Sequence, residues 1–218
     1  MEKSIKNYPV FLIIFGLVLG VAIFSTFNYF KLARQITGDK TVDSQRSVSF
    51  QIRESDHILG NRDSNITLVI FQEFTCPYCE EYMKTLEDFM ADYNDKIRIV
   101  WRHFPLNFAN QTAIASAVAS ECAADQDKFW EYAHQLYENQ DILDSQLYPQ
   151  LANNLGLDLD QFNQCLQENN YKDKVEAHYN EGLIKGVQGT PTSFLNGRSI
   201  PGALPYYDLQ QLIDPLTQ

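Results

Sequence analysis

The feature that most constrains this chain is a Cys-Pro-Tyr-Cys motif at residues 76–79, directly after a run of apolar residues. The run, 66–74, is typical of a buried strand, because Leu, Val, Ile and Phe follow one another at its centre. Beyond the motif, apolar side chains recur at helical spacing, so we expect a helix over 77–94 that begins at Pro77. A Cys-x-x-Cys pair at such a junction indicates a reversible dithiol/disulfide site.

The two cysteines of this motif are expected to have different roles. Cys76 would lie at the helix N-terminus, where unpaired N–H groups and the helix dipole stabilise a thiolate and lower its pKa. Cys79 lies one turn further along and is placed to resolve a mixed disulfide formed at Cys76. Pro77 stiffens the turn and Tyr78 adds a ring with a hydroxyl, so we expect both residues to tune the site.

The same motif has further uses, which stay open on these residues alone. A zinc site needs two further ligands, and neither Cys122 and Cys165 nor any pair of histidines has the matching spacing. A copper site or a purely structural disulfide would also fit two cysteines at this spacing, although a four-residue loop is a poor staple. We therefore expect no cofactor and no metal.

A second element, Gly-Thr-Pro-Thr at residues 189–192, precedes a predicted hairpin with an Asn-Gly turn. An X-Pro bond before a strand is a candidate cis peptide. A cis bond between Thr190 and Pro191 would leave the Thr190 backbone exposed beside Cys76, where an extended substrate segment can pair with it. An ordinary turn proline is the alternative.

The N-terminal region differs from the rest of the chain, because residues 10–30 carry no charge. As a helix this stretch would be about 30 Å long, the thickness of a bilayer core. We expect a signal anchor that stays in the membrane. A cleaved signal peptide is the alternative, but the run is long for one and no Ala-x-Ala site follows it. Lysines on both sides leave the orientation undecided by charge.

The remaining sequence divides naturally into segments. We expect a short N-terminal segment at 1–9, a transmembrane anchor at 10–30 and a polar tether at 31–57, which ends in a short strand at 48–52. A globular domain follows at 58–218. Within the domain we expect a parallel second strand at 96–101 and a helical insertion over about 107–187. A hairpin at 192–200 and a closing helix at 204–216 follow. The formal net charge of −11 argues against nucleic acid as a partner.

Together these motifs resemble the thioredoxin superfamily, and more closely the DsbA-like thiol:disulfide oxidoreductases of bacterial envelopes. The stretches that carry the resemblance are 59–61, 74–79, 102–106, 119–123, 128–130, 186–192 and 194–197. The resemblance implies an α/β thioredoxin fold with an inserted helical subdomain. It also implies that Cys76 attacks, that Cys79 resolves and that Pro191 is cis.

Tyr78 and Glu73 are two positions at or near the motif whose roles stay open. The best-known enzymes of this family carry His where Tyr78 stands, so the oxidising strength of the pair stays open. Glu73, three residues before Cys76, resembles an acidic position of many relatives and is a candidate proton relay. A salt-bridged or merely polar glutamate is the alternative.

The other two cysteines belong to the helical region, where Ile114, Val118 and Cys122 recur on one face of a predicted helix. Similar membrane-anchored relatives often carry a cysteine here with a partner downstream, so the resemblance favours a Cys122–Cys165 disulfide. Two buried free thiols are the alternative. A structural disulfide requires an oxidising compartment, which would place the domain on the extracytoplasmic side.

The resemblance thus implies a membrane-anchored oxidase that donates the Cys76–Cys79 disulfide to unfolded or reduced secreted proteins. The partner that it implies for reoxidation is a quinone-linked membrane protein. An isomerase or a reductase would use the same two cysteines. A copper-binding or chaperone module is the non-enzymatic alternative.

Overall fold

The computed structural model describes residues 47–107 and 110–217. The expected anchor, 10–30, lies outside these residues, as does most of the tether. Within the described part, each helix is too short or too polar to cross a bilayer.

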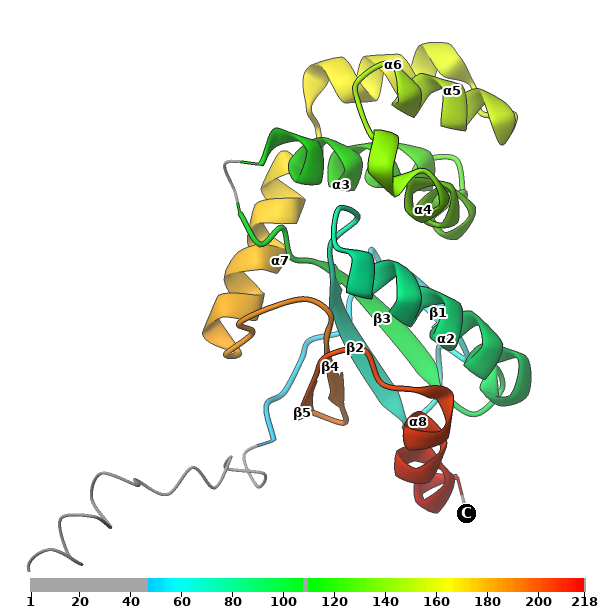
Figure 1. Ribbon diagram of the computed structural model, residues 1–218, viewed down its shortest axis with the longest axis vertical. Helices are drawn as coiled ribbons and strands as arrows, with labels where there is room; N and C mark the ends of the chain where they lie inside the picture. The colour runs from blue at the N-terminus through cyan, green and yellow to red at the C-terminus, as the bar shows by residue number, and fades with distance from the viewer. Residues whose placement is uncertain (1–46, 108–109, 218) are drawn as a thin grey trace, which may run out of the picture. The chain divides into compact units, whose positions relative to one another are not determined.

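A five-stranded mixed sheet forms the centre of the domain (Figure 1), in the order β1-β3-β2-β4-β5. Its strands are Ile58–Gly60, Thr67–Gln72, Arg98–His103, Thr192–Leu195 and Arg198–Pro201, numbered β1 to β5 in chain order. As the strand–helix–strand pattern predicted, β2 and β3 are parallel. The other neighbouring strands are antiparallel. This order places β2, which leads to the Cys-x-x-Cys motif, in the middle of the sheet.

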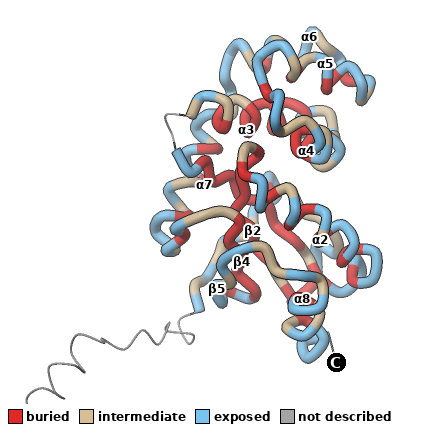
Figure 2. The backbone as a smooth tube through the Cα atoms, in the orientation of Figure 1, coloured by how far each residue is buried: buried red, intermediate tan, exposed pale blue. Residues whose placement is uncertain are grey.

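The central strand β2 is buried on both faces, so its apolar run needs no polar alternation. Leu68 and Ile70 belong to the larger core, which they share with side chains of α2 (Pro77–Tyr93) and α8 (Tyr206–Ile213). Val69 and Phe71 point the other way into a smaller core. Figure 2 shows the buried backbone concentrated in this sheet and in the helices next to it.

The expected strand over 48–52 is wrong. This segment has no strand structure, although the Val48 amide donates to the Gly197 carbonyl over 2.9 Å. Side chains hold it instead, since the Phe50 ring lies 5.0 Å from that of Phe194 and packs on the smaller core. The strand that precedes β2 is β1, a three-residue strand too short to show an alternating pattern.

The predicted helical insertion lies between β3 and β4 and contains α3 to α7 with one short 3-10 helix. Their bounds are Gln111–Ala124, Phe129–Glu138, Gln140–Ile142 (η1), Leu147–Asn154, Leu159–Glu168 and Lys172–Ile184. Asn110 and Asp158 cap α3 and α6 with side-chain oxygens that accept from backbone N–H groups. Cys122 of α3 and Cys165 of α6 form a disulfide, with their Cα atoms 5.8 Å apart.

The hairpin of β4 and β5 turns at Asn196 and Gly197, as the Asn-Gly pair predicted. Both residues have a positive φ, 46° and 84°. A Cβ atom at Gly197 would lie 2.0 Å from the Val48 carbonyl oxygen, so the N-terminal segment can approach only a glycine here. After the hairpin, α8 and a short 3-10 helix, Asp214–Leu216, complete the domain.

Candidate active site

The Cys-x-x-Cys pair lies where the end of β2 passes into α2. Cys76 is the N-cap residue of α2 and Pro77 occupies its first turn, where a missing N–H costs nothing. Both cysteines are thiols in the structure. Cys76 keeps 7% of its surface exposed and Cys79 keeps none. A substrate can therefore reach the first sulfur before the second.

The surroundings of the two sulfurs lower the pKa of Cys76 and raise the pKa of Cys79. The pKa of Cys76 falls from an ordinary 9.0 to about 6, chiefly because the Cys79 thiol hydrogen-bonds to its sulfur. Burial opposes this effect, while Thr190 and the backbone N–H groups of Tyr78 and Cys79 lower the pKa further. The direction agrees with the sequence prediction, but the second thiol contributes more than the helix start. Burial, followed by the Cys76 sulfur, raises the pKa of Cys79 well above its ordinary value.

The Thr190–Pro191 peptide bond is cis and faces the first cysteine. The Cys76 thiol donates to the Thr190 carbonyl oxygen, with the sulfur 3.4 Å away. The Thr190 hydroxyl is buried, and it has no hydrogen-bond partner within the described part of the chain. This hydroxyl is therefore available to donate to a thiolate at Cys76.

The Tyr78 side chain does not cover the sulfurs, since 65% of its surface is exposed. Its backbone N–H, rather than its ring, contributes to the lowered pKa of Cys76. The ring instead forms part of the accessible surface next to the motif. The tuning roles expected for Tyr78 and Pro77 stay predictions.

Glu73 is 6% exposed and its carboxylate accepts hydrogen bonds from neutral groups. Oε2 accepts from the Leu106 amide over 2.9 Å, and Oε1 accepts from the Thr75 hydroxyl. Among the described residues it has no cationic partner, so the salt-bridged alternative is not what the structure contains. The carboxylate fastens the strand that leads to Cys76 to the loop after β3.

Two residues of the helical insertion, Tyr137 and Gln140, contact the segment that leads from β2 to Cys76. The Gln140 amide donates to the Phe74 carbonyl over 2.7 Å and to the Cys76 carbonyl over 3.0 Å. The ring of Tyr137 packs 5.1 Å from that of Phe74, and its hydroxyl donates to the Glu73 carbonyl over 3.5 Å. Both residues lie more than 60 positions from the residues that they contact, so no local pattern signals them.

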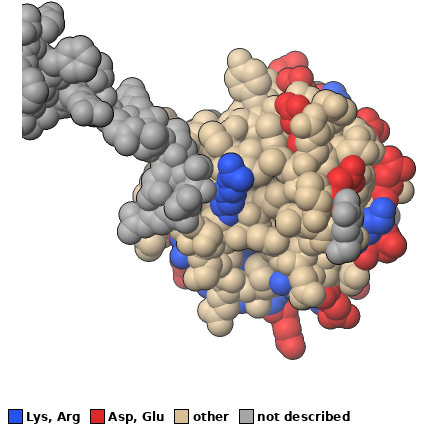
Figure 3. Space-filling view, turned by 90° about the horizontal axis from the view of Figure 1, so that it is seen from below, with Lys and Arg blue, Asp and Glu red and all other residues tan. Residues whose placement is uncertain are grey.

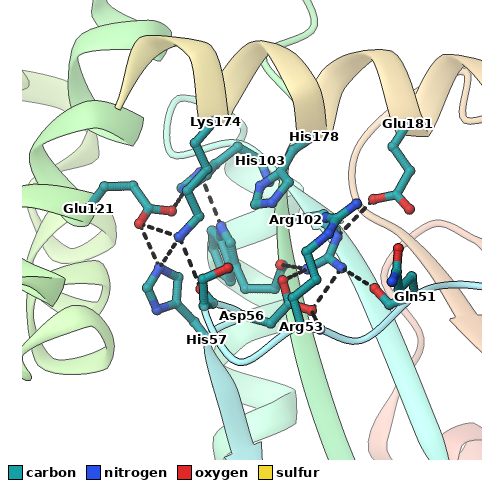
Figure 4. A network of polar contacts seen from close by, with 12 residues as sticks. Gln51, Arg53, Asp56, His57, Arg102, His103, Glu121, Lys174, His178 and Glu181 are labelled. Atoms are coloured by element: carbon teal, nitrogen blue, oxygen red, sulfur yellow. Dashed lines mark hydrogen bonds and ion pairs between the residues drawn. The ribbon is translucent and has the colours of Figure 1, made fainter. Parts of the chain in front are cut away.

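A buried network of charged groups joins the sheet to the insertion (Figure 4). The fully buried Arg102 guanidinium makes two hydrogen bonds to Asp56, of 2.7 and 3.0 Å, and one of 2.9 Å to Glu181. A bidentate pair of this kind satisfies both partners without water. It holds β3, α7 and the segment before β1 together.

The second half of this network centres on Glu121 of α3. The Trp101 indole can only donate, so His103 accepts at Nδ1 over 3.1 Å and donates from Nε2 to Glu121 over 2.9 Å. Lys174 and His57 contact the other carboxylate oxygen at 2.7 and 2.8 Å. The hydrogen bonds to the two histidines hold the pKa of Glu121 well below its ordinary value, although burial opposes them.

The face of the domain drawn in Figure 3 is not basic. Figure 3 shows one face, on which Asp and Glu gather along one side while Lys and Arg are few and scattered. Within the described residues, this face offers no continuous basic surface.

Comparisons with known proteins agree on the fold. The sequence profile of the thioredoxin family matches residues 53–215. Alpha-DsbA1 of Wolbachia pipientis superposes with a TM-score of 0.69 at 22% identity, over 77% of this chain and 94% of that one. BdbD of Bacillus subtilis superposes with a TM-score of 0.67 at 22% identity, over 78% and 97%. These two likenesses show a shared DsbA-like fold with a helical insertion.

Curated sequences give a different kind of relative. The chain is 36% identical over 148 residues to Na(+)/H(+) antiporter NhaA 1 of Mycolicibacterium gilvum. The match covers 66% of this chain and 24% of the antiporter. The chain thus spans about a quarter of the length of the curated relatives that it matches.

Proposed function

Because this chain belongs to the thioredoxin family, as a disulfide oxidoreductase with a Cys-x-x-Cys pair, we propose that it introduces disulfides into secreted or envelope proteins. The observation that carries this direction is the difference between its two thiols. A sulfur whose thiolate is stabilised makes the reduced protein more stable, and so makes the disulfide a stronger oxidant. The lowered pKa of Cys76 supports that direction.

The reaction begins with the Cys76–Cys79 disulfide. A substrate thiolate attacks the Cys76 sulfur, a mixed disulfide forms, and Cys79 leaves as a thiolate that takes up a proton. A second thiolate of the substrate then attacks the substrate sulfur of the mixed disulfide and releases the Cys76 thiolate. The substrate gains one disulfide and loses two electrons, and these two electrons reduce the Cys76–Cys79 disulfide. The low pKa of Cys76 makes it the better leaving group in this second step.

The substrate is a reduced, unfolded protein segment that pairs with the backbone next to the cis peptide. Thr190 and Pro191 form this backbone edge beside Cys76, the cis-proline ledge, and their geometry supports the role. Pro77 and Tyr78 tune the site from the first turn of α2. Glu73 relays a proton to or from the pair.

The domain works on the extracytoplasmic side, held by a membrane anchor at 10–30 and a tether over 31–57. The Cys122–Cys165 disulfide supports this placement, because such bonds persist in oxidising compartments. The match to part of an ion antiporter supports a location beside a membrane. A quinone-linked membrane protein returns the pair to the disulfide.

The second candidate function is that of an isomerase or reductase with the same residues, and exposed Tyr78 in place of His favours it. A chaperone or copper-binding module is the non-enzymatic alternative. The equilibrium of the pair against glutathione separates the first two, because a strongly reducing value would overturn the oxidase.

The test of exchange is the Cys79→Ser variant, mixed with a reduced, unfolded secreted protein and an oxidant. We expect mixed disulfides between Cys76 and the substrate to accumulate, since the resolving thiol is gone. The Cys76→Ser variant is the matched control and should trap none. Absence of trapped substrate in both variants would contradict an exchange function and favour a binding module.

A further inference from the structure

The loop that carries the reactive cysteine is fastened to the helical insertion by one side chain. Gln140, half-buried in η1, lies with its amide against two backbone carbonyls, those of Phe74 and Cys76. Both groups can only accept, so the NH₂ end of the amide must face them and must use both of its hydrogens. The side chain thus bridges the two residues that flank Thr75.

The Cys76 carbonyl also accepts the first backbone hydrogen bonds of α2. It accepts from the N–H groups of Cys79 over 3.0 Å and Glu80 over 3.3 Å. Gln140 adds a further donor to the same oxygen, from outside the helix. The amide therefore fixes the peptide plane from which the Cys76 side chain extends.

The position of this plane matters for the chemistry. The Cys76 sulfur must stay near the N–H groups of Tyr78 and Cys79 and near the Thr190 hydroxyl, because these donors lower its pKa. A loop without its outside donor can move relative to Thr190 and Pro191, which directly precede β4. The sulfur would then lose part of the donor set that stabilises its thiolate.

We infer that Gln140 is a positioning residue for thiol–disulfide exchange, which holds the Cys76 loop against the cis-proline ledge from the helical insertion. This inference rests on the proposed function of Cys76. The helical insertion thus takes part in the reaction, because η1, which carries Gln140, lies within it.

The test compares Gln140→Met, which keeps the length of the side chain, with Gln140→Ala, which removes it. In both variants we expect the thiolate titration of Cys76, followed by ultraviolet absorbance, to move up by about half to one pH unit, as the loss of such donors implies. The glutathione equilibrium should shift about three- to tenfold toward a less oxidising pair, because the same thiolate is less stable.

Gln126→Met is the matched control. Its amide also bonds to backbone, donating to Asp158 over 3.1 Å at the start of α6, within the same insertion. It should leave the titration of Cys76 unchanged. A control that shifts the titration as far as Gln140→Met does would overturn the inference, as would a shift with Ala but none with Met, because packing would then be the cause.

The titration also separates this inference from the proposed function. Wild-type protein that titrates with a low pKa but exchanges no disulfide contradicts the proposed function. Wild-type protein that exchanges, together with Gln140 variants that titrate as it does, contradicts only the inference.

Discussion

The Cys76 sulfur and the Thr190 carbonyl oxygen lie 3.4 Å apart, although 114 residues separate them in sequence. The contact joins the start of α2 to the cis peptide before β4. It places the reactive sulfur at the edge where an extended substrate backbone would pair. Reactivity at Cys76 and substrate binding at Thr190 are therefore expected to change together.

The first prediction concerns the pH dependence of Cys76. Because its pKa is lowered to about 6, alkylation of the reduced protein by iodoacetamide should speed up through that pH and level off above it. Cys79 is fully buried and its pKa is raised, so it should not add to the rate in this range. Cys76→Ser protein supplies the background rate. A midpoint near the ordinary value of 9.0 would contradict the proposed environment.

The second prediction concerns the Thr190 hydroxyl, which is buried without a partner in the described structure. Thr190→Val keeps the shape and removes this hydroxyl, which is free to donate to the Cys76 thiolate. We expect the pKa of Cys76 to rise by about half a pH unit and the disulfide to become a weaker oxidant. Thiolate titration and glutathione equilibration measure the two effects.

The control for this variant is Thr85→Val, on the exposed side of α2, where the hydroxyl bonds to the Glu81 carbonyl. It changes the same chemical group in the helix that carries Cys79, but away from the sulfurs. An equal shift in both variants would point to a general change in α2. The role assigned to Thr190 would then be wrong.

Local patterns explain which parts of the site could be predicted. The apolar run of β2, the proline at the start of α2 and the Asn-Gly turn act within a few residues, so the sequence predicts them. β1 has only three residues and takes its structure from pairing with β3. The segment over 48–52 has the composition of a strand, yet side-chain packing of Phe50 holds it without a ladder.

The polar contacts around the site depend on the tertiary fold. Gln140 lies in a short 3-10 helix, and its sequence neighbours give no sign that its amide faces the Cys76 loop. Glu121 lies in an Ala- and Ser-rich helix, where a carboxylate is ordinarily turned to solvent, yet it is 1% exposed. It can be buried because His103 and Lys174 reach it from β3 and α7.

The third prediction concerns the disulfide between α3 and α6. Replacing Cys122 and Cys165 with alanine opens a loop of 43 residues, which should lower the free energy of unfolding by about 4 kcal/mol. Urea unfolding of the double variant against wild type measures the loss. The thiolate titration of Cys76 should stay unchanged, because the bond lies within the helical insertion. An unchanged urea midpoint would contradict a structural role.

The fourth prediction concerns acid sensitivity. Burial, with His103 and the charged Arg102 nearby, lowers the pKa of His178 to about 2. In the unfolded chain this residue takes up a proton below about pH 6.5. The unfolded state thus binds more protons than the folded state, so the free energy of unfolding should fall as the pH drops below that value. Burial lowers the pKa of His103 as well, which acts in the same direction.

The variant that tests this is His178→Gln, whose side chain can still accept from the His103 amide, now 3.4 Å from His178 Nδ1. Glutamine does not titrate, so the slope of unfolding free energy against pH should flatten by up to about 1.4 kcal/mol per pH unit below pH 6.5. The difference in free energy of unfolding between the two proteins at about pH 8, where a histidine is neutral in either state, measures the effect of packing and is subtracted. Parallel curves from that pH down to about 5 would mean that His178 takes up its proton in the folded protein too, and would contradict the lowered pKa.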